Sequence, residues 1–74
     1  QNKHDVKLYP IPIAANQKLH FNQQLTNISI YDITGRLIKH QKGTYNQILM
    51  PNVPDGYYIF KSEKPFTTKR IIVD

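Results

Sequence analysis

The sequence predicts an all-β domain, an antiparallel sandwich of about seven short strands. Apolar residues alternate with polar residues along several short segments, which is the period of a half-buried strand. Turn signals built from Pro, Gly, Asp and Asn separate these segments roughly every ten residues. No stretch shows the ~3.6-residue period of an amphipathic helix. No linker or internal repeat is visible, so we expect a single module.

The small size of the chain limits how much surface it can bury. It has 74 residues and no cysteine, so it is one small domain or a fragment of a longer protein, without a disulfide. The formal charge is +5, but the basic residues are scattered, and only Lys69 and Arg70 are adjacent. Scattered charge is typical of a solvated surface rather than of a nucleic-acid or lipid site. No apolar run reaches the ~20 residues of a membrane span, so no direct membrane span is predicted.

The first strand is expected where Val6 and Leu8 alternate with polar neighbours. Pro10 and Pro12 follow it. Because proline lacks an N–H donor, this strand is predicted to end there and to lie at a sheet edge. Two more strands are indicated by apolar residues two positions apart, which are Leu19 with Phe21 and Ile28 with Ile30.

A tight turn follows at residues 32–35. Asp32 stands at the first position of a type I turn and Gly35 at the fourth, where glycine can adopt the left-handed backbone of a bulged hairpin. Leu37 begins the returning strand, which becomes polar and is predicted to break at Gly43. A further short apolar strand is expected at residues 48–50.

The last third of the chain contains the strongest strand signal. Residues 54–56 form a compact turn that ends at Gly56 and leads into the aromatic and β-branched run 57–61. Tyr58 is expected to be a core ring with a polar tip. The final strand is predicted at residues 67–73, with Ile71 and Val73 on the face opposite Ile72.

No pattern in the chain indicates catalysis, a metal site or a cofactor. The three histidines, the two serines and the five acidic residues are dispersed, and there is no glycine-rich phosphate loop. We therefore expect no enzyme activity. We expect the histidines and serines to face outward from strands: His4, His20, His40, Ser29 and Ser62.

The aromatic residues leave one alternative open. Exposed rings beside basic residues on a β-sheet can bind single-stranded nucleic acid. Phe21, Tyr58 and Phe60 lie in strand alternations where a core position is the simpler interpretation. The remaining tyrosines belong to separate segments rather than to an evident cluster, and no nucleic-acid partner is predicted from them: Tyr9, Tyr31, Tyr45 and Tyr57.

Four short motifs follow one another along nearly the whole chain. They are Tyr9-Pro10-Ile11-Pro12, the segment from Ile28 to Ile38 that reads ISIYDITGRLI, the segment from Val53 to Lys61 that reads VPDGYYIFK, and Lys69-Arg70-Ile71-Ile72-Val73. In this order they resemble the type A C-terminal sorting domain of the type IX secretion system. Ile11 departs from the family's asparagine, and the segment after Pro12 is longer than usual.

The resemblance implies a seven-stranded Ig-like sandwich with Greek-key connections and a role as a non-enzymatic transport signal. Residues 1–5 would be a linker remnant near a cleavage region, and residues 6–74 the sorting domain. The implied partners are an N-terminal cargo domain, an outer-membrane shuttle β-barrel, the type IX translocon and a cysteine-peptidase sortase. The implied location is the periplasm in transit, then the cell surface or the medium, as a monomer or weak dimer.

Two groups of residues are expected to carry this role. Arg36 can offer a planar donor fork to a receptor, and the last strand can add to a partner's sheet edge or simply close the sandwich. The predicted partner-binding residues are Arg36, Lys69, Arg70, Ile71, Ile72 and Val73. The predicted structural motif residues are Tyr9, Pro10, Pro12, Asp32, Gly35, Gly56 and Tyr58. The rival interpretation is an Ig-like binding or spacer module of a surface protein that is not a signal.

Overall fold

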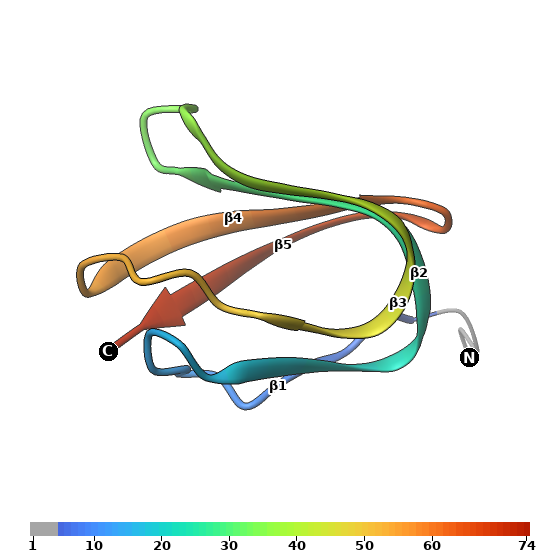
Figure 1. Ribbon diagram of the computed structural model, residues 1–74, viewed down its shortest axis with the longest axis horizontal. Coiled ribbons are helices and arrows are strands. Elements are labelled where there is room, and N and C mark those ends of the chain that lie inside the picture. Colours follow the sequence, from blue (N-terminus) through green and yellow to red (C-terminus); the bar gives the residue numbers. More distant parts are fainter. Residues whose placement is uncertain (1–4) are drawn as a thin grey trace.

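The computed structural model describes residues 5–74 and shows one curled antiparallel sheet of five strands (Figure 1). The strands are β1 (Leu8–Tyr9), β2 (Lys18–Asp32), β3 (Leu37–Leu49), β4 (Gly56–Glu63) and β5 (Phe66–Val73). The all-β prediction is confirmed. A seven-stranded sandwich is not what the chain forms, because strands predicted separately are continuous in β2 and again in β3.

The long strand β2 contains both predicted strands at Leu19/Phe21 and Ile28/Ile30. The polar stretch between them has the pattern of a connection, yet the strand continues through it, and its pairing with β3 resumes at Leu25 and Thr26. Irregularities in the register absorb the change of direction, and one of them falls between Thr26 and Ile28. Asn27, between those two residues, has a φ of 55°. A bulge of this kind bends a strand without ending it.

The prediction that Gly43 breaks the returning strand is wrong, since β3 runs through it to Leu49. Gly43 has a φ of 111°, a backbone conformation that L side chains rarely adopt. Its N–H donates to the Asn27 side-chain Oδ1 at 2.9 Å, so the two unusual residues face each other across the hairpin. Gly43 therefore forms part of a β-bulge and does not end the strand.

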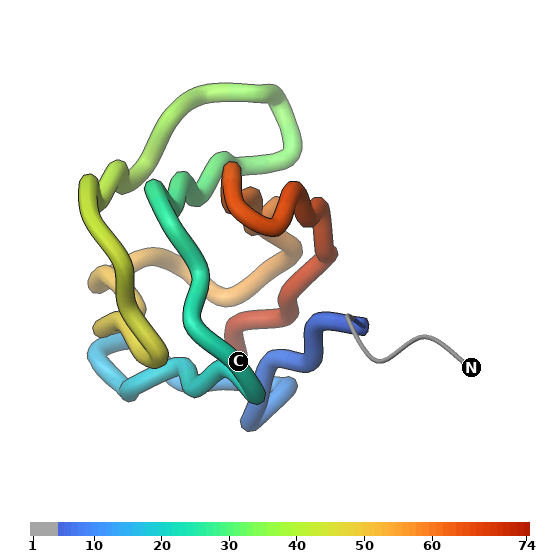
Figure 2. Tube along the Cα trace, turned by 90° about the vertical axis from the view of Figure 1, so that its right-hand side faces the viewer, coloured from blue at the N-terminus to red at the C-terminus, as the bar shows by residue number. Residues whose placement is uncertain are grey.

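Because of the bend, the two halves of β2 pair with different strands. The strand order is β1-β2-β4-β5, with β3 along the other side of β2. The N-terminal half of β2 pairs with β1 through His20 and Phe21, and its C-terminal end, Ser29 to Asp32, pairs with β4. The sheet consequently folds over, and its strands wrap around a common interior (Figure 2). As predicted, β1 lies at the end of this order.

A short parallel bridge between Ile13 and Val73 closes the curled sheet. The N–H of Ile13 donates to the Ile72 carbonyl at 2.8 Å, and the N–H of Asp74 donates to the Ile13 carbonyl at 3.0 Å. A residue from the first fifth of the chain thus holds the end of β5.

One hydrophobic cluster fills the interior. Phe21 and Phe60 meet there edge to face, with ring centroids 5.3 Å apart. The predicted alternations in β2 and β5 and the core positions of Phe21, Tyr58 and Phe60 are confirmed. The cluster consists of Val6, Ile13, Leu19, Phe21, Leu25, Ile28, Ile30, Ile48, Met50, Tyr58, Phe60, Ile71 and Val73. Within residues 5–74, no helix is long and apolar enough to cross a membrane.

Candidate partner-binding surfaces

The β2–β3 hairpin ends in the predicted tight turn. The N–H of Gly35 donates to the Asp32 carbonyl at 3.0 Å, which closes the four-residue turn, and the Asp32 N–H donates to the Arg36 carbonyl at 3.0 Å. Gly35 has a φ of 92°. Both sequence predictions for this turn, Asp at its first position and glycine in the left-handed region, are confirmed.

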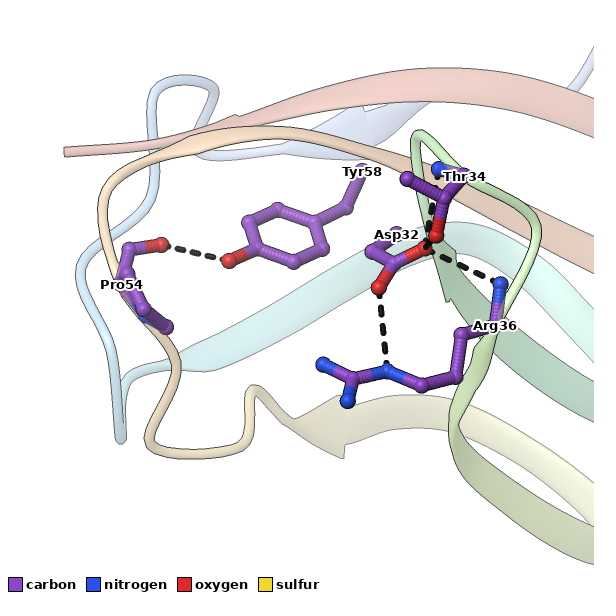
Figure 3. A network of polar contacts seen from close by, with 5 residues as sticks. All are labelled: Asp32, Thr34, Arg36, Pro54 and Tyr58. Atoms are coloured by element: carbon purple, nitrogen blue, oxygen red, sulfur yellow. Dashed lines mark hydrogen bonds and ion pairs between the residues drawn. The ribbon is translucent and has the colours of Figure 1, made fainter.

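The Asp32 carboxylate binds the rest of the turn (Figure 3). Its Oδ1 accepts from the Thr34 hydroxyl at 2.6 Å, the Thr34 N–H at 2.9 Å and the Arg36 N–H at 3.0 Å. The hydrogen bond from the Thr34 hydroxyl is the first cause that holds the pKa of Asp32 below its ordinary value, and the Arg36 N–H adds to it. Asp32 is therefore ionised and fixed in direction at neutral pH.

The Arg36 side chain forms an ion pair with Asp32, which the sequence did not predict. Its Nε donates to the Asp32 Oδ2 at 3.1 Å, while 76% of its side chain is exposed. In Figure 3 the two terminal nitrogens point away from the carboxylate. The ion pair thus fixes the orientation of the guanidinium group and leaves its terminal donors directed to solvent, where a receptor carboxylate or carbonyl could accept from them.

Tyr58 and Gly56 build the start of β4, as predicted. The Tyr58 ring is buried, and its hydroxyl donates to the Pro54 carbonyl at 2.6 Å, which ties the preceding turn to the core (Figure 3). Gly56 has a φ of 150° and lies opposite Val73 in the ladder. Their surroundings give both residues a structural role.

The Tyr-Pro-Ile-Pro motif forms the exit from β1. Tyr9 is the last residue of β1, and its exposed ring stacks on His20 with centroids 5.6 Å apart. The chain then turns through Pro10 and Pro12 to Ile13. The motif therefore leads from the edge strand to the residue that closes the sheet. The role of Ile13 was not predicted, since one apolar residue after a proline carries no sequence signal for a bridge to the last strand.

The five predicted contact residues at the C-terminal end of the chain divide between the two faces of β5. Ile71 and Val73 are buried in the core. Lys69 shares their face at the rim, where its Nζ lies 3.8 Å from the Asp5 Oδ1. Arg70 and Ile72 point to the outer face, and Arg70 is exposed. In the folded domain only Lys69, Arg70 and Ile72 can offer side chains to a partner.

The outer edge of β5 is open over part of its length. Ile13 occupies the peptide groups of Ile72 and Asp74 on that edge. Because alternate peptide groups of a strand point the same way, those of Thr68 and Arg70 also face this edge. None of the residues that the structure describes pairs with them there. The part of β5 to which a partner strand could add is therefore limited to residues 66–70.

A shallow groove of about 330 Å³ lies beside this open edge. One wall comes from β1 and the residues on either side of it, and the other from β5. Asp5 lies between Lys7 and Lys69, at 3.2 Å and 3.8 Å from their Nζ atoms. The groove residues are Asp5, Val6, Lys7, Leu8, Ile11, Lys69 and Arg70.

The described residues form no group of histidine and acidic side chains that could hold a metal ion. His20 stacks on Tyr9, His40 shares a 3.0 Å hydrogen bond with Ser29, and Ser62 donates to the Pro65 carbonyl at 2.8 Å. His4 lies outside the described residues, as does the predicted linker apart from Asp5. These contacts give His20, His40, Ser29 and Ser62 structural partners. The predicted outward position of Ser62 is wrong, because its side chain is buried, with 2% exposed, and bonds to the turn that follows β4.

Comparison with known proteins identifies the family. The family model described as the secretion system C-terminal sorting domain matches residues 7–74, which is nearly the whole chain. No curated protein matches the chain, and no solved structure does. The match extends over the hairpin turn, the Tyr58 strand and the last strand described above, and the chain belongs to the C-terminal sorting domains of the type IX secretion system.

Proposed function

We propose that the chain directs a cargo protein through the type IX system across the outer membrane, and that a sortase then removes it during attachment of the cargo to the cell surface. The family match over residues 7–74 is the observation that carries this proposal. A sorting domain of this family is a non-catalytic tail, which agrees with the absence of catalytic patterns in the sequence. Export to the cell surface or the medium follows from the family's role.

The proposed partners are the shuttle β-barrel and translocon of the outer membrane, the sortase, and the cargo domain on the N-terminal side. Two surfaces are suited to a receptor. One is the hairpin tip, where Asp32 orients the exposed Arg36. The other is the edge of β5 at residues 66–70, with Lys69 and Arg70 beside it. None of the described residues pairs with the peptide groups of Thr68 and Arg70 on this edge, so a partner strand can use them.

A reporter fusion tests both the function and the surfaces. Residues 1–74 are placed behind a periplasm-targeted reporter in a host that has this secretion system. Three variants accompany the intact fusion: Arg36→Gln, Lys69→Gln with Arg70→Gln, and Lys18→Gln with Lys42→Gln. The last pair is the matched control, because it removes two positive charges from exposed residues of β2 and β3.

We expect surface display of the intact fusion and of the control, and reduced display of the other two variants. Mass spectrometry of the displayed reporter should show that residues 6–74 are gone. An intact fusion that stays in the periplasm would refute the sorting function. Display of the Arg36 and Lys69/Arg70 variants at the control level would refute the assigned surfaces alone.

A further inference from the structure

One row of side chains crosses four strands on the outer face of the sheet. Tyr31 in β2 lies opposite Leu37 in β3 on one side and opposite Ile59 in β4 on the other, and Ile59 lies opposite Arg70 in β5. Directly paired residues of antiparallel strands point to the same face. Leu37 is 51% exposed, and Tyr31 and Ile59 are half-buried. The row is therefore an accessible apolar stripe with a cation at its end.

A second tyrosine and a second cation extend this row. Tyr57 lies opposite Ile72, two residues along β4 and β5 from the Ile59–Arg70 pair and on the same face, and is 53% exposed. The Lys61 Nζ lies 5.3 Å from the Tyr31 ring centroid, and the Arg70 guanidinium carbon lies 5.8 Å from that of Tyr57. Tyr31 and Tyr57, which the sequence places in separate segments, thus lie on the same face of the neighbouring strands β2 and β4. Together these residues form what we call the outer patch: Tyr31, Leu37, Tyr57, Ile59, Lys61, Arg70 and Ile72.

The outer patch carries two positive charges and no carboxylate. Of the carboxylates beside it, that of Asp32 is bound by Thr34 and Arg36, and that of Glu63 accepts from Asn27. Asp74 follows Ile72 by two residues and forms no ion pair with Lys61 or Arg70. Lys61 and Arg70 are both exposed and contact aromatic rings rather than acids. Apolar side chains flanked by uncompensated cations are complementary to a partner that combines apolar groups with carboxylates.

A hollow of about 260 Å³ marks one end of the outer patch. Its walls include Tyr31 and Ile59, with Lys61 at the same opening, and Ile33 at its rim is 73% exposed. A concave site with apolar walls and a cation at its edge suits one apolar side chain that has an acidic neighbour. The hairpin turn supplies the remaining walls, Asp32 and Gly35.

We propose that the outer patch is a docking surface for an extended protein segment that carries one apolar anchor residue flanked by carboxylates. The anchor enters the hollow beside Tyr31 and Ile59, and the carboxylates accept hydrogen bonds from Lys61 and Arg70. A single-stranded nucleic acid fits this surface less well, because Lys61 and Arg70 lie over the Tyr31 and Tyr57 rings and compete with bases for these ring faces. The inference goes beyond the sorting function and concerns the folded domain alone.

An NMR titration of the isotope-labelled 74-residue chain tests the proposal at low salt. The probe is a capped synthetic peptide with one phenylalanine flanked by two glutamates on each side, and its matched control has lysines in place of the glutamates. We expect the glutamate peptide, and not the lysine peptide, to shift the amide signals of Tyr31, Tyr57, Ile59 and Arg70.

Three variants locate the contact. Lys61→Gln with Arg70→Gln should weaken binding about three- to tenfold, the range for losing two exposed ion pairs. Lys18→Gln with Lys42→Gln removes the same charge elsewhere and should leave binding within about twofold at the same salt concentration. Ile33→Asp places an acid at the rim of the hollow and should also weaken binding. Because Ile33 is exposed, this variant should fold normally.

Several outcomes would overturn the proposal. Equal binding of the two peptides, equal weakening by the two double variants, or shifts confined to the groove beside β5 would each show that the outer patch is not the site. Tighter binding of an oligothymidine, with the steep salt dependence of phosphate contacts, would assign the surface to nucleic acid instead. The purified chain is used throughout, so failure here would leave the reporter-export result unchanged.

Discussion

The Asp32 side chain organises the β2–β3 turn because one carboxylate can accept several hydrogen bonds at once. Three of its bonds go to Thr34 and Arg36 through Oδ1, and the fourth joins Oδ2 to the Arg36 Nε. Gly35 contributes only its backbone, since a Cβ at that position would meet no atom within 4 Å. The turn is therefore specified by acceptor capacity at one residue and by conformation at another.

Replacing Gly35 tests the conformational part. The φ of 92° lies in the region that disfavours an L side chain, so Gly35→Ala should lower the free energy of unfolding by about 1–2 kcal/mol. Ile33→Ala, in the same turn and exposed, should change it by less than about 0.5 kcal/mol. Urea unfolding followed by circular dichroism measures both values. A neutral Gly35→Ala would mean that the turn relaxes to another conformation.

Replacing Asp32 tests the electrostatic part through pH. The Thr34 hydroxyl, followed by the Arg36 N–H, lowers the pKa of Asp32 in the folded state. A carboxylate with a lowered folded-state pKa stabilises the fold above its unfolded-state pKa, and this contribution is lost as pH falls through the folded-state value. The stability gap between the natural chain and the Asp32→Asn variant should therefore be largest near neutral pH and shrink below about pH 4.

Unfolding curves measured at a series of pH values test this prediction. Thr34→Ala removes the main hydrogen bond behind the lowered pKa. Its pH-dependent loss of stability should therefore be smaller than that of the natural chain and be complete at a higher pH. If the gap between the natural chain and the Asp32→Asn variant stays constant from neutral pH into the acid range, the carboxylate charge does not support the turn.

Residue-level patterns in the sequence predicted the roles of Asp32, Gly35 and Tyr58 because each depends on local chemistry. Turn position, backbone freedom and strand alternation are all legible within a few residues. The ion pair between Arg36 and Asp32 could not be predicted from such local patterns. It depends on the rotamer that the long Arg36 side chain adopts once the turn has formed. From the sequence alone, a guanidinium group available to a receptor was an equally good prediction.

At the level of elements, the bend in the β2–β3 hairpin decides the architecture. Asn27 has a φ of 55°, accepts from the Gly43 N–H through Oδ1 and donates through Nδ2 to the Glu63 Oε1 at 3.0 Å. The last bond joins the bend to the end of β4. The Asn27 side chain therefore bonds to Gly43 on the opposite strand of the bulge and to Glu63 in β4. It links the bulge to the neighbouring β4–β5 hairpin.

Asn27→Ala should lower the free energy of unfolding by about 1–3 kcal/mol. It keeps the strained backbone position and loses both side-chain hydrogen bonds. Asn27→Gly loses the same bonds without the conformational strain, so it should cost less than the alanine variant. Chemical denaturation of the two variants separates these contributions. Equal losses would show that only the hydrogen bonds matter, and no loss in either would exclude Asn27 as the organiser of the bend.

This bend is also where strand prediction from the sequence failed. The polar residues after Phe21 and the glycine at position 43 look like connections, so each long strand was predicted as two short ones. Asparagine tolerates a positive φ, and glycine adopts one readily. The two residues lie 16 positions apart, and only the pairing of β2 with β3 makes them one bulge. Such a tertiary relation has no local signature.

At the scale of the whole molecule, the end of the chain is part of the core. Val73 and Ile71 belong to the buried cluster, and Ile13 bonds to the peptide groups on either side of Val73. The sequence predicted a last strand that closes the fold or contacts a partner. In the structure its two ends differ. Residues 72–74 close the sheet, while at residues 66–70 no residue within 5–74 pairs with the outer edge.

Removal of residues 69–74 should therefore unfold the domain. The deletion takes away the buried Ile71 and Val73, worth roughly 1.5–3 kcal/mol each, together with the ladder to β4 and the bridge to Ile13. The total stability expected for 74 residues is only roughly 4–11 kcal/mol. Circular dichroism and urea titration should show that the truncated chain has no cooperative transition. Removal of Asp74 alone loses one backbone hydrogen bond, worth about 1 kcal/mol, and should keep the transition.

This comparison decides how loss of export after truncation is to be interpreted. If the truncated chain is unfolded, its failure to be exported reports the loss of the fold, and the Lys69/Arg70 substitutions alone report contact with a receptor. A cooperative transition retained after removal of residues 69–74 would contradict the closing role of β5. The end of the chain would then act in transport through contact alone, because the core would not depend on it.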